Sequence, residues 1–161
     1  MPIQTSTAIT IDAPRAHVFQ SAAGIDPCAL IQKHGPLPGI VNCEGHDAPW
    51  SEVGQRRRHT LSDNSSVNEE LIDFAENEHY AYRVTDFTGP FTSLVDHARG
   101  EWRFTEISPT TARIDWTYSF FPKGALAAPL LWFIVKLLWP GYLMSALARV
   151  KEKAQNENRH V

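Results

Sequence analysis

The stretch TARIDWTYSF, residues 111–120, alternates strictly between apolar and polar side chains. Its apolar face carries Ala112, Ile114, Trp116, Tyr118 and Phe120, and its other face carries arginine, aspartate, threonine and serine. A strand with this two-residue period belongs to a sheet that has one covered face and one face in water. The segment from Leu94 to Glu106 repeats the pattern, and a short Ser-Pro-Thr turn joins it to the strand from Thr111 to Phe121. We therefore predict an antiparallel sheet built on this hairpin.

Further candidate strands lie on the N-terminal side of the hairpin. They are Ile3 to Asp12, Ile40 to Gly45, Val53 to Leu61, Ser66 to Phe74 and His79 to Phe87. Helix-start residues predict a helix from Arg15 to Ala23 and a shorter one from Cys28 to Lys33. Near the C-terminus, an apolar stripe at helical spacing is formed by Leu143, Leu147, Val150 and Ala154. The predicted fold class is α+β, a helix-grip arrangement in which a curved antiparallel sheet wraps around a long C-terminal helix, with two short helices after the first strand.

Composition limits the classes of function. The 161 residues are expected to form one domain, residues 1–161, and 43% hydrophobic with 20% charged residues is typical of a globular chain. A formal net charge of −3 disfavours a nucleic-acid partner, which selects a basic face. The N-terminus lacks a signal-peptide pattern, and Cys28 and Cys43 are interpreted as reduced structural thiols, so we expect a cytoplasmic protein.

The sequence contains no familiar catalytic signature. The seven histidines show no metal-ligand spacing, and there is no Cys-x-x-Cys pair, Gly-x-Ser-x-Gly elbow or phosphate-binding glycine loop. We therefore expect neither a metal nor a cofactor.

One segment is unusually apolar. From Ala125 to Ala148, Lys136 is the only charged residue, and roughly 20 apolar residues suffice to cross a bilayer. The central lysine, and Pro140-Gly141, which should interrupt a helix, argue against a membrane span. The part from Leu130 to Trp139 is apolar nearly all round a helix. It is interpreted as a buried extension of the terminal helix, a lid, a peripheral membrane contact or a homodimer interface.

Several segments, in this order and spacing, resemble one superfamily. They are Ile9 to Pro14 with Val18-Phe19, Gly54 to Arg57, Val67 to Leu71, Tyr82 to Val84, Gly100 to Phe104 and Thr111 to Trp116. The chain is similar to the START-like, or SRPBCC, superfamily, and within it to the polyketide cyclase/dehydrase and lipid-transport branch. The resemblance implies a cavity between sheet and terminal helix that relatives use for lipids, quinones, sterols, hormones or polyketides. Some relatives are enzymes and many are carriers, so the fold alone does not choose between them.

Because side chains alternate between the two faces of a strand, the sequence also indicates which residues face the expected cavity. Those expected to bind the ligand are Arg57, His59, Glu69, Tyr82, Trp102, Phe104, Trp116 and Tyr118 from the sheet, with Leu143 and Leu147 from the helix. Arg57 and Glu69 are hypothesised to orient a polar head group, and Tyr82 to donate a hydroxyl. In an apolar site Glu69 would also suit a general acid or base, which makes it the candidate catalytic residue.

The same residues have plainer interpretations. Arg57 and Glu69 are also consistent with an exposed cross-strand ion pair, worth about 0–1 kcal/mol. Glu70 can replace Glu69 on the inner face, because Ile72 and Phe74 compete with Leu71 for the buried side of that strand and a bulge shifts parity.

Three functional hypotheses follow from the sequence. The first is a carrier or sensor that holds a hydrophobic small molecule (lipid, quinone or polyketide-like) in the cavity. The second is a cyclase- or dehydratase-type enzyme that uses an inward carboxylate. The third is a membrane-associated or dimeric interaction protein that uses the segment from Leu130 to Trp139.

Overall fold

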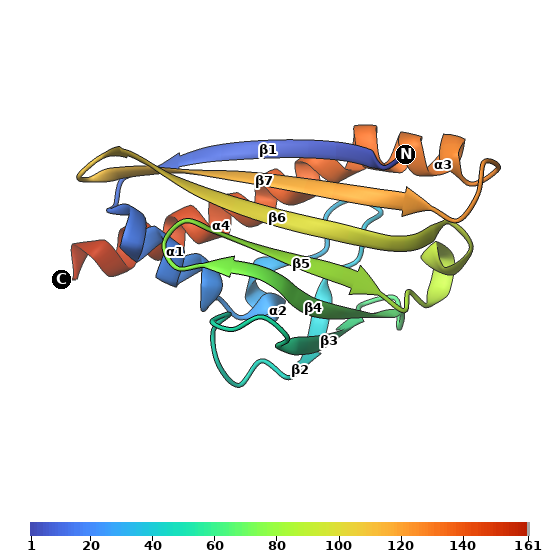
Figure 1. Cartoon of the computed structure of the whole chain (residues 1–161), viewed down its shortest axis with the longest axis horizontal. Helices are drawn as coiled ribbons and strands as arrows, with labels where there is room; N and C mark the ends of the chain where they lie inside the picture. Colours follow the sequence, from blue (N-terminus) through green and yellow to red (C-terminus); the bar gives the residue numbers. More distant parts are fainter. Residues whose placement is uncertain (161) are drawn as a thin grey trace.

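One curved antiparallel sheet dominates the computed structural model, which describes residues 1–160 of the chain (Figure 1). Its strands are β1 (Ile3–Ile11), β2 (Ile40–Glu44), β3 (Arg56–Leu61), β4 (Ser66–Ala75), β5 (His79–Thr85), β6 (Val95–Ser108) and β7 (Thr111–Pro122). They pair in the order β1-β7-β6-β5-β4-β3-β2, so the first strand closes onto the last and the others follow as a meander. The predicted antiparallel sheet and its central β6–β7 hairpin are confirmed.

Helical segments cover one face of the sheet. They are α1 (Arg15–Ala23), α2 (Pro27–Leu30), the short 3-10 turn η1 (Gly89–Ser93), α3 (Ala128–Phe133), the π-helical turn η2 (Ile134–Leu138) and α4 (Trp139–Arg159). Figure 1 shows α4 running behind the strands, along the face that the sheet curves around. The α+β helix-grip arrangement predicted from the sequence is thus confirmed, including the bounds of α1.

The register of β6 and β7 places the aromatic residues. Trp102 pairs with Trp116, and Gly100 pairs with Tyr118. Paired residues point to the same face, so the aromatic side chains gather toward α4. From the helix, Leu143, Leu147 and Val150 complete the core and are at most 1% exposed. Burial of an apolar side chain of this size contributes about 1.5–3 kcal/mol, so this contact is a principal stabiliser of the fold.

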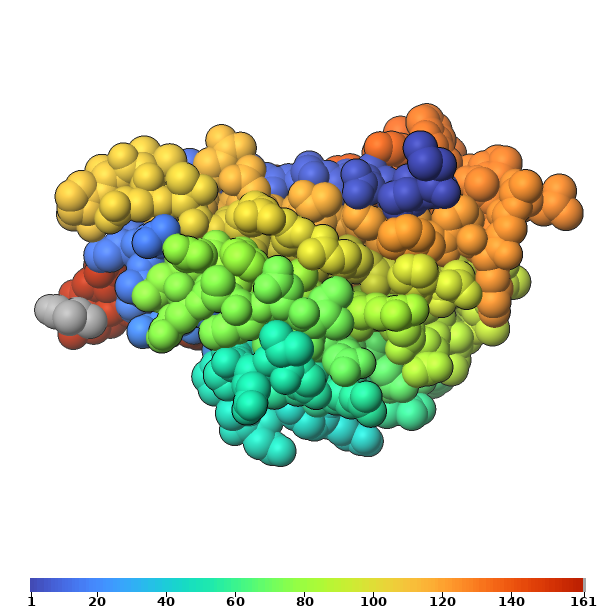
Figure 2. All heavy atoms as spheres, viewed as in Figure 1, coloured from blue at the N-terminus to red at the C-terminus, as the bar shows by residue number. Residues whose placement is uncertain are grey.

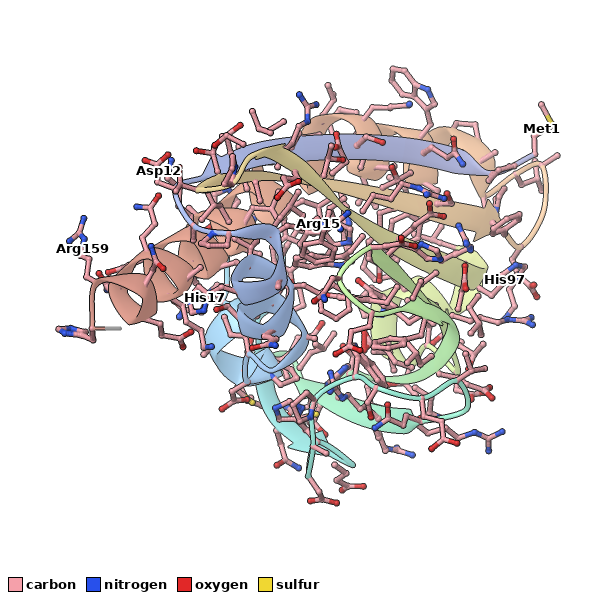
Figure 3. All side chains as sticks on the ribbon, turned by 60° about the vertical axis from the view of Figure 1, so that its left-hand side comes forward. Met1, Asp12, Arg15, His17, His97 and Arg159 are labelled. Atoms are coloured by element: carbon pink, nitrogen blue, oxygen red, sulfur yellow. The ribbon has the colours of Figure 1, made fainter. Side chains whose placement is uncertain are left out.

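Polar contacts fix the C-terminal half of α4 against α1. Glu157 accepts a hydrogen bond from Ser21 (2.8 Å) and forms an ion pair with Lys153 (2.6 Å). His17 lies on α1 facing the end of α4, as Figure 3 shows, and its Nε2 is 2.9 Å from the carbonyl oxygen of Ala154. On the next turns, Arg149 donates to the carbonyl of Leu30 at 2.9 Å. Polar contacts therefore fix the C-terminal half of α4, while the N-terminal end of α4 borders the cavity.

Some element boundaries differ from the prediction. Val53 lies outside β3 and is 57% exposed, because the chain turns at Gly54 (φ +100°) before the strand begins. The second short helix covers only Pro27–Leu30, since Ile31 adopts an extended conformation. A bulge between Leu71 and Asp73 shifts the parity of β4, so Leu71 and Phe74 both face inward.

The prediction that Pro140-Gly141 interrupts the helix is wrong. The helix runs continuously from Ala128 to Arg159 because η2 widens the turn just before the proline. In η2 the backbone N–H of Trp139 donates to the carbonyl of Ile134, five residues back. Proline lacks a backbone N–H, and a widened turn beside it relieves the clash that proline otherwise causes. By length and composition Ala128–Arg159 is long and apolar enough to cross a membrane, yet its C-terminal half forms the core described above.

Candidate functional site

A cavity lies between the concave face of the sheet and the start of α4. It has a free volume of about 120 Å³, roughly ten times what one water molecule needs on the same measure. Its wall includes side chains from β3 to β7, from α2 and from α4, together with η1 and the loop before it. A space of this kind, lined mainly by apolar groups with a few polar ones, is the usual form of a small-molecule site.

Aromatic rings form most of the cavity wall. Trp102 and Trp116 are 4.3 Å apart between ring centroids, and Tyr80 stacks on Trp102 at 5.6 Å. From the helix side, Trp139 contacts Tyr118 at 5.5 Å. Such aromatic pairs add about 0.5–1.5 kcal/mol each beyond simple burial. The wall is therefore rigid as well as apolar.

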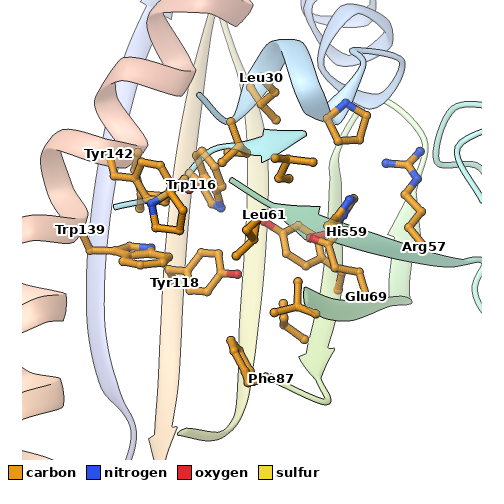
Figure 4. A pocket seen from close by; sticks show the side chains of 18 of the residues that line it. Leu30, Arg57, His59, Leu61, Glu69, Phe87, Trp116, Tyr118, Trp139 and Tyr142 are labelled. Carbon is orange, nitrogen blue, oxygen red and sulfur yellow. Dashed lines mark hydrogen bonds and ion pairs between the residues drawn. The ribbon is translucent and has the colours of Figure 1, made fainter. Parts of the chain in front are cut away.

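A histidine and a glutamate form the polar end of the cavity. Figure 4 shows His59 and Glu69 on one side of the space and Tyr118, Trp139 and Tyr142 on the other. The Nε2 of His59 is 2.7 Å from the Oε2 of Glu69, and the two side chains are 2% and 15% exposed. Burial alone lowers the pKa of His59, but the neighbouring Glu69 carboxylate outweighs it and raises that pKa to about 10. At neutral pH the imidazole is therefore cationic and paired.

Arg57 does not take the partner predicted for it. Its guanidinium stacks over the Trp50 ring at 3.6 Å and donates to the carbonyl of Ala48 at 3.2 Å. Although Arg57 and Glu69 are opposite each other in the β3–β4 register, the carboxylate bonds His59 instead. The predicted Arg57–Glu69 pair is thus replaced by a His59–Glu69 pair, with Arg57 anchored in a cation–π contact.

The question between Glu69 and Glu70 is answered by the register. Glu69 lines the cavity, whereas Glu70 faces outward and lies 3.6 Å from Arg56. The bulge follows at Leu71/Asp73, after Glu69, and so leaves Glu69 on the inner face. The alternative with Glu70 inside is wrong.

Several buried donors near the cavity have no partner within residues 1–160. They are Nδ1 of His59, Nε1 of Trp116 and Nε1 of Trp139. Trp102 donates to the hydroxyl of Tyr82, but only at 3.5 Å. A buried N–H without an acceptor costs about 1–3 kcal/mol, so an acceptor that enters the cavity removes part of this cost.

The other predicted residues divide into two groups. Tyr82, Trp102, Trp116, Tyr118 and Leu143 line the cavity with Arg57, His59 and Glu69. Phe104 and Leu147 do not line it. Phe104 packs against Phe19 of α1 at 4.9 Å, and Leu147 is fully buried one turn of helix beyond Leu143. Both residues face inward as predicted, but beyond the closed end of the cavity.

Sequence reasoning missed part of the wall. The aromatic residues in that part are Trp50, Tyr80, Phe87, Phe91, Phe120, Trp139 and Tyr142. Trp50, Phe87 and Phe91 lie in loops or short turns, where no periodicity marks an inward side chain. Tyr142 is held by its hydroxyl, which donates to the carbonyl of Pro38. Tyr80 was detectable, since it shares the face of Tyr82.

The segment before α4 is exposed on one side. Leu131 and Val135 are fully buried, but Leu130, Phe133 and Leu137 are 54%, 49% and 59% exposed. Figure 2 shows this orange part of the chain protruding at one end of the molecule. We call Leu130, Phe133 and Leu137 the apolar stripe. The interpretation of this segment as a wholly buried extension is therefore wrong.

Comparison with known proteins gives the following findings. The family model described as "Polyketide cyclase / dehydrase and lipid transport" matches residues 2–155. A search of curated proteins finds no match. Among solved structures, the Zhui aromatase/cyclase from a Streptomyces species aligns with a TM-score of 0.72 at 16% identity, covering 98% of this chain and 96% of that one.

Further solved structures share the fold. A Thermus thermophilus protein aligns with a TM-score of 0.69 at 16% identity, covering 96% of this chain and 98% of that one. A Nitrosospira multiformis protein aligns with a TM-score of 0.67 at 19% identity, covering 97% and 99%. At these identities the alignments establish the shared fold, and the activity must be argued from the site.

Proposed function

The chain belongs to the polyketide cyclase/dehydrase and lipid transport family, and from that premise we propose that it binds an apolar small molecule inside the cavity between the sheet and α4. The observation that carries the proposal is an aromatic-walled cavity of about 120 Å³ that ends at the buried His59–Glu69 pair. An apolar guest removes its own surface from water at about 25 cal/mol per Å². Binding therefore needs no covalent or metal contact.

The unpartnered donors define the chemistry of the ligand further. Trp116 and Trp139 both line the cavity, and the indole N–H of each has no acceptor within the described residues. A ligand that carries carbonyl or hydroxyl oxygens satisfies such donors, whereas a plain hydrocarbon leaves them unpaired. We therefore favour an oxygen-bearing apolar molecule, such as a quinone or a polyketide-like compound, over a saturated chain.

A fluorescent probe tests the proposal. Val67 lines the cavity on β4, and Ile72 lies on the same strand with its side chain 39% exposed. Val67→Phe fills the cavity, and Ile72→Phe adds the same bulk outside it. We expect Val67→Phe to weaken binding of 1-anilinonaphthalene-8-sulfonate at least about tenfold, while Ile72→Phe leaves it unchanged.

The contrary outcomes are clear. Equal affinity in Val67→Phe and the wild type would place the probe elsewhere and contradict the proposal. Binding that disappears in Leu137→Asp but persists in Val67→Phe would assign the probe to the apolar stripe. Mass spectrometry of the solvent extract of the purified protein then identifies any natural ligand that it retains.

Exchange of the ligand at a membrane is a finer form of this proposal. The apolar stripe lies in α3 and η2, directly before α4. Two residues of α4, Trp139 and Leu143, line the cavity. Between Asp115 and Glu152 the chain has no acidic residue but four basic ones, which are Lys123, Lys136, Arg149 and Lys151. Apolar side chains flanked by cations favour an anionic lipid surface over a second copy of an acidic chain.

Catalysis is the second candidate function, and the His59–Glu69 pair favours it. A buried carboxylate bonded to an imidazole can accept and return a proton within the cavity, as a cyclase or dehydratase requires. Glu69→Gln separates the alternatives once a ligand is known. Turnover lost with binding retained supports the enzyme, and unchanged turnover removes Glu69 from the mechanism.

A further inference from the structure

Three reactive side chains lie in a row across the edge of the sheet. Cys43 on β2 is directly opposite His59 on β3, and Glu69 on β4 bonds the imidazole at Nε2. Side chains directly opposite on antiparallel strands share a face, with Cβ atoms about 4.5–5.5 Å apart. The thiol, the imidazole and the carboxylate therefore follow one another on the inner face of the sheet.

The imidazole has one nitrogen left for the thiol. Its Nε2 is taken by Glu69, and its Nδ1 is buried without a hydrogen-bond partner among residues 1–160. His59 is 2% exposed, so bulk solvent does not reach that nitrogen. After burial, which lowers the pKa of His59, and Glu69, which raises it, the Cys43 thiol is the next group to raise that pKa. The ring and the sulfur are therefore neighbours across the β2–β3 pairing, although no hydrogen bond joins them in this structure.

From this geometry we propose that Cys43 is a nucleophilic thiol, activated by His59 and positioned through Glu69, that adds covalently to α,β-unsaturated carbonyl compounds. An imidazole beside a thiol, itself oriented by a third group, is the arrangement that activates a cysteine. The absence of a hydrogen bond between sulfur and Nδ1 does not exclude this role, since catalytic hydrogen bonds often form fully only when a substrate is bound.

The addition balances without any further reagent. His59 is already cationic at neutral pH, so the thiol loses its proton to solvent and the imidazolium stabilises the thiolate, which attacks the β-carbon of the unsaturated carbonyl to form a carbon–sulfur bond. The electron pair of the carbon–carbon double bond moves onto the carbonyl oxygen as an enolate. The proton then passes from the imidazolium to the α-carbon, which restores the carbonyl, and the neutral imidazole regains a proton from solvent, which replaces the one that the thiol released.

Access to the sulfur does not require the cavity to be open. Cys43 is half-buried on β2, which is the last strand in the sheet order, and it is not among the residues that line the cavity. The inference is therefore independent of the proposed ligand.

The chain offers an internal control in Cys28. Both cysteines are free and half-buried. Cys28 lies on α2, where burial raises the pKa of its thiol and the Asp26 carboxylate raises it further. Like Cys43 it is half-buried, but its neighbouring ionisable group is a carboxylate and not an imidazole.

Competition for limited N-ethylmaleimide tests the proposal on the full chain. Peptide mass spectrometry gives the alkylation rate of each cysteine in the same sample, in buffer and in guanidinium chloride. We expect Cys43 to react at least about tenfold faster than Cys28 in the folded protein, and at a similar rate once the chain is unfolded. In His59→Gln we expect the advantage to fall to within about twofold, with the Cys28 rate unchanged.

The opposite results are equally specific. A Cys43 rate no higher than that of Cys28 in the native wild type would overturn the proposal, whatever the variants do. An advantage that survives in a folded His59→Gln would show that exposure, and not the imidazole, sets the rate. A changed Cys28 rate in His59→Gln reveals an altered fold, in which case the milder variant Glu69→Gln replaces it and should lower the advantage in part.

Discussion

The ring of Tyr82 lies across Gly100, so that a Cβ atom at residue 100 would stand 2.3 Å from Cζ of the tyrosine. The two residues are paired between β5 and β6, and the absence of a side chain on one lets the other lie flat against the strand. Tyr82 in turn contacts Tyr118 at 6.3 Å between ring centroids. The shape of the cavity wall at this point therefore depends on one glycine.

Gly100→Ala should disturb both stability and binding. The methyl group displaces the Tyr82 ring, which is 6% exposed, and overpacking of this kind costs about 1–3 kcal/mol. Urea denaturation measures the loss, and weaker binding of 1-anilinonaphthalene-8-sulfonate reports the ring's movement into the cavity. Gly124→Ala is the control, because an added Cβ there meets nothing within 4 Å. Equal effects of the two substitutions would contradict the close contact.

The His59–Glu69 pair should make stability fall as pH rises. The pKa of His59 is raised from 6.5 in the unfolded chain to about 10 in the folded protein. Its contribution is therefore fully present below pH 6.5 and is lost as pH rises through 10. The slope for one proton is at most about 1.4 kcal/mol per pH unit. Free energies of unfolding for the wild type and His59→Gln should converge between pH 6.5 and 10, and parallel curves would count against the pair.

The apolar stripe should govern membrane association. Leu137→Asp places a charge where 59% of a leucine is exposed, and Val41→Asp makes the same change at a side chain that is 60% exposed on β2. A leucine transferred into lipid contributes about 1.5–3 kcal/mol, which corresponds to roughly 10- to 100-fold in binding. We expect flotation with phosphatidylglycerol vesicles to be lost in Leu137→Asp and retained in Val41→Asp. If the wild-type protein does not float with the vesicles, exchange of the ligand at a membrane is ruled out.

Glu157→Ala should loosen α4 from α1. The carboxylate bonds Ser21 and Lys153 but is 42% exposed, so its removal should cost only about 1 kcal/mol. Although burial raises the pKa of Glu157, its hydrogen bonds from Lys153 and Ser21 lower it below the usual 4.5. The contribution is therefore present above pH 4.5 and disappears in acid. Denaturation at pH 7 and pH 3 checks this, and the exposed Glu152→Ala should change neither value.

The sequence predicted the fold because its alternation is strong. The side of the sheet that each residue of β6 and β7 faces follows from a two-residue period within each strand, and the bounds of α1 follow from Pro14 just before it and Gly24 just after it. The cavity face of β3, β4 and β5 was assigned in the same way. The alternation no longer predicts which face a side chain occupies after Leu71, because a bulge inserts one extra residue there. No residue type in the sequence marks that bulge.

The partners of the polar residues were not predictable from parity. It places Arg57, His59 and Glu69 on one face but does not say which two meet, since that depends on rotamers and on what else each side chain contacts. Trp50, which captures the Arg57 guanidinium, comes from a loop with no periodic signal. The row from Cys43 to Glu69 spans three strands and exists only in their register.

By itself the sequence determined that strands with one aromatic face close over an amphipathic terminal helix, because alternation and helical spacing are properties of a chain segment. Only the tertiary structure decided that His59 bonds Glu69, that Tyr82 lies on Gly100, and that the apolar stripe emerges from the core while its neighbours Leu131 and Val135 do not. These relations depend on which atoms from distant segments occupy the same space, and the packing of the whole chain sets that.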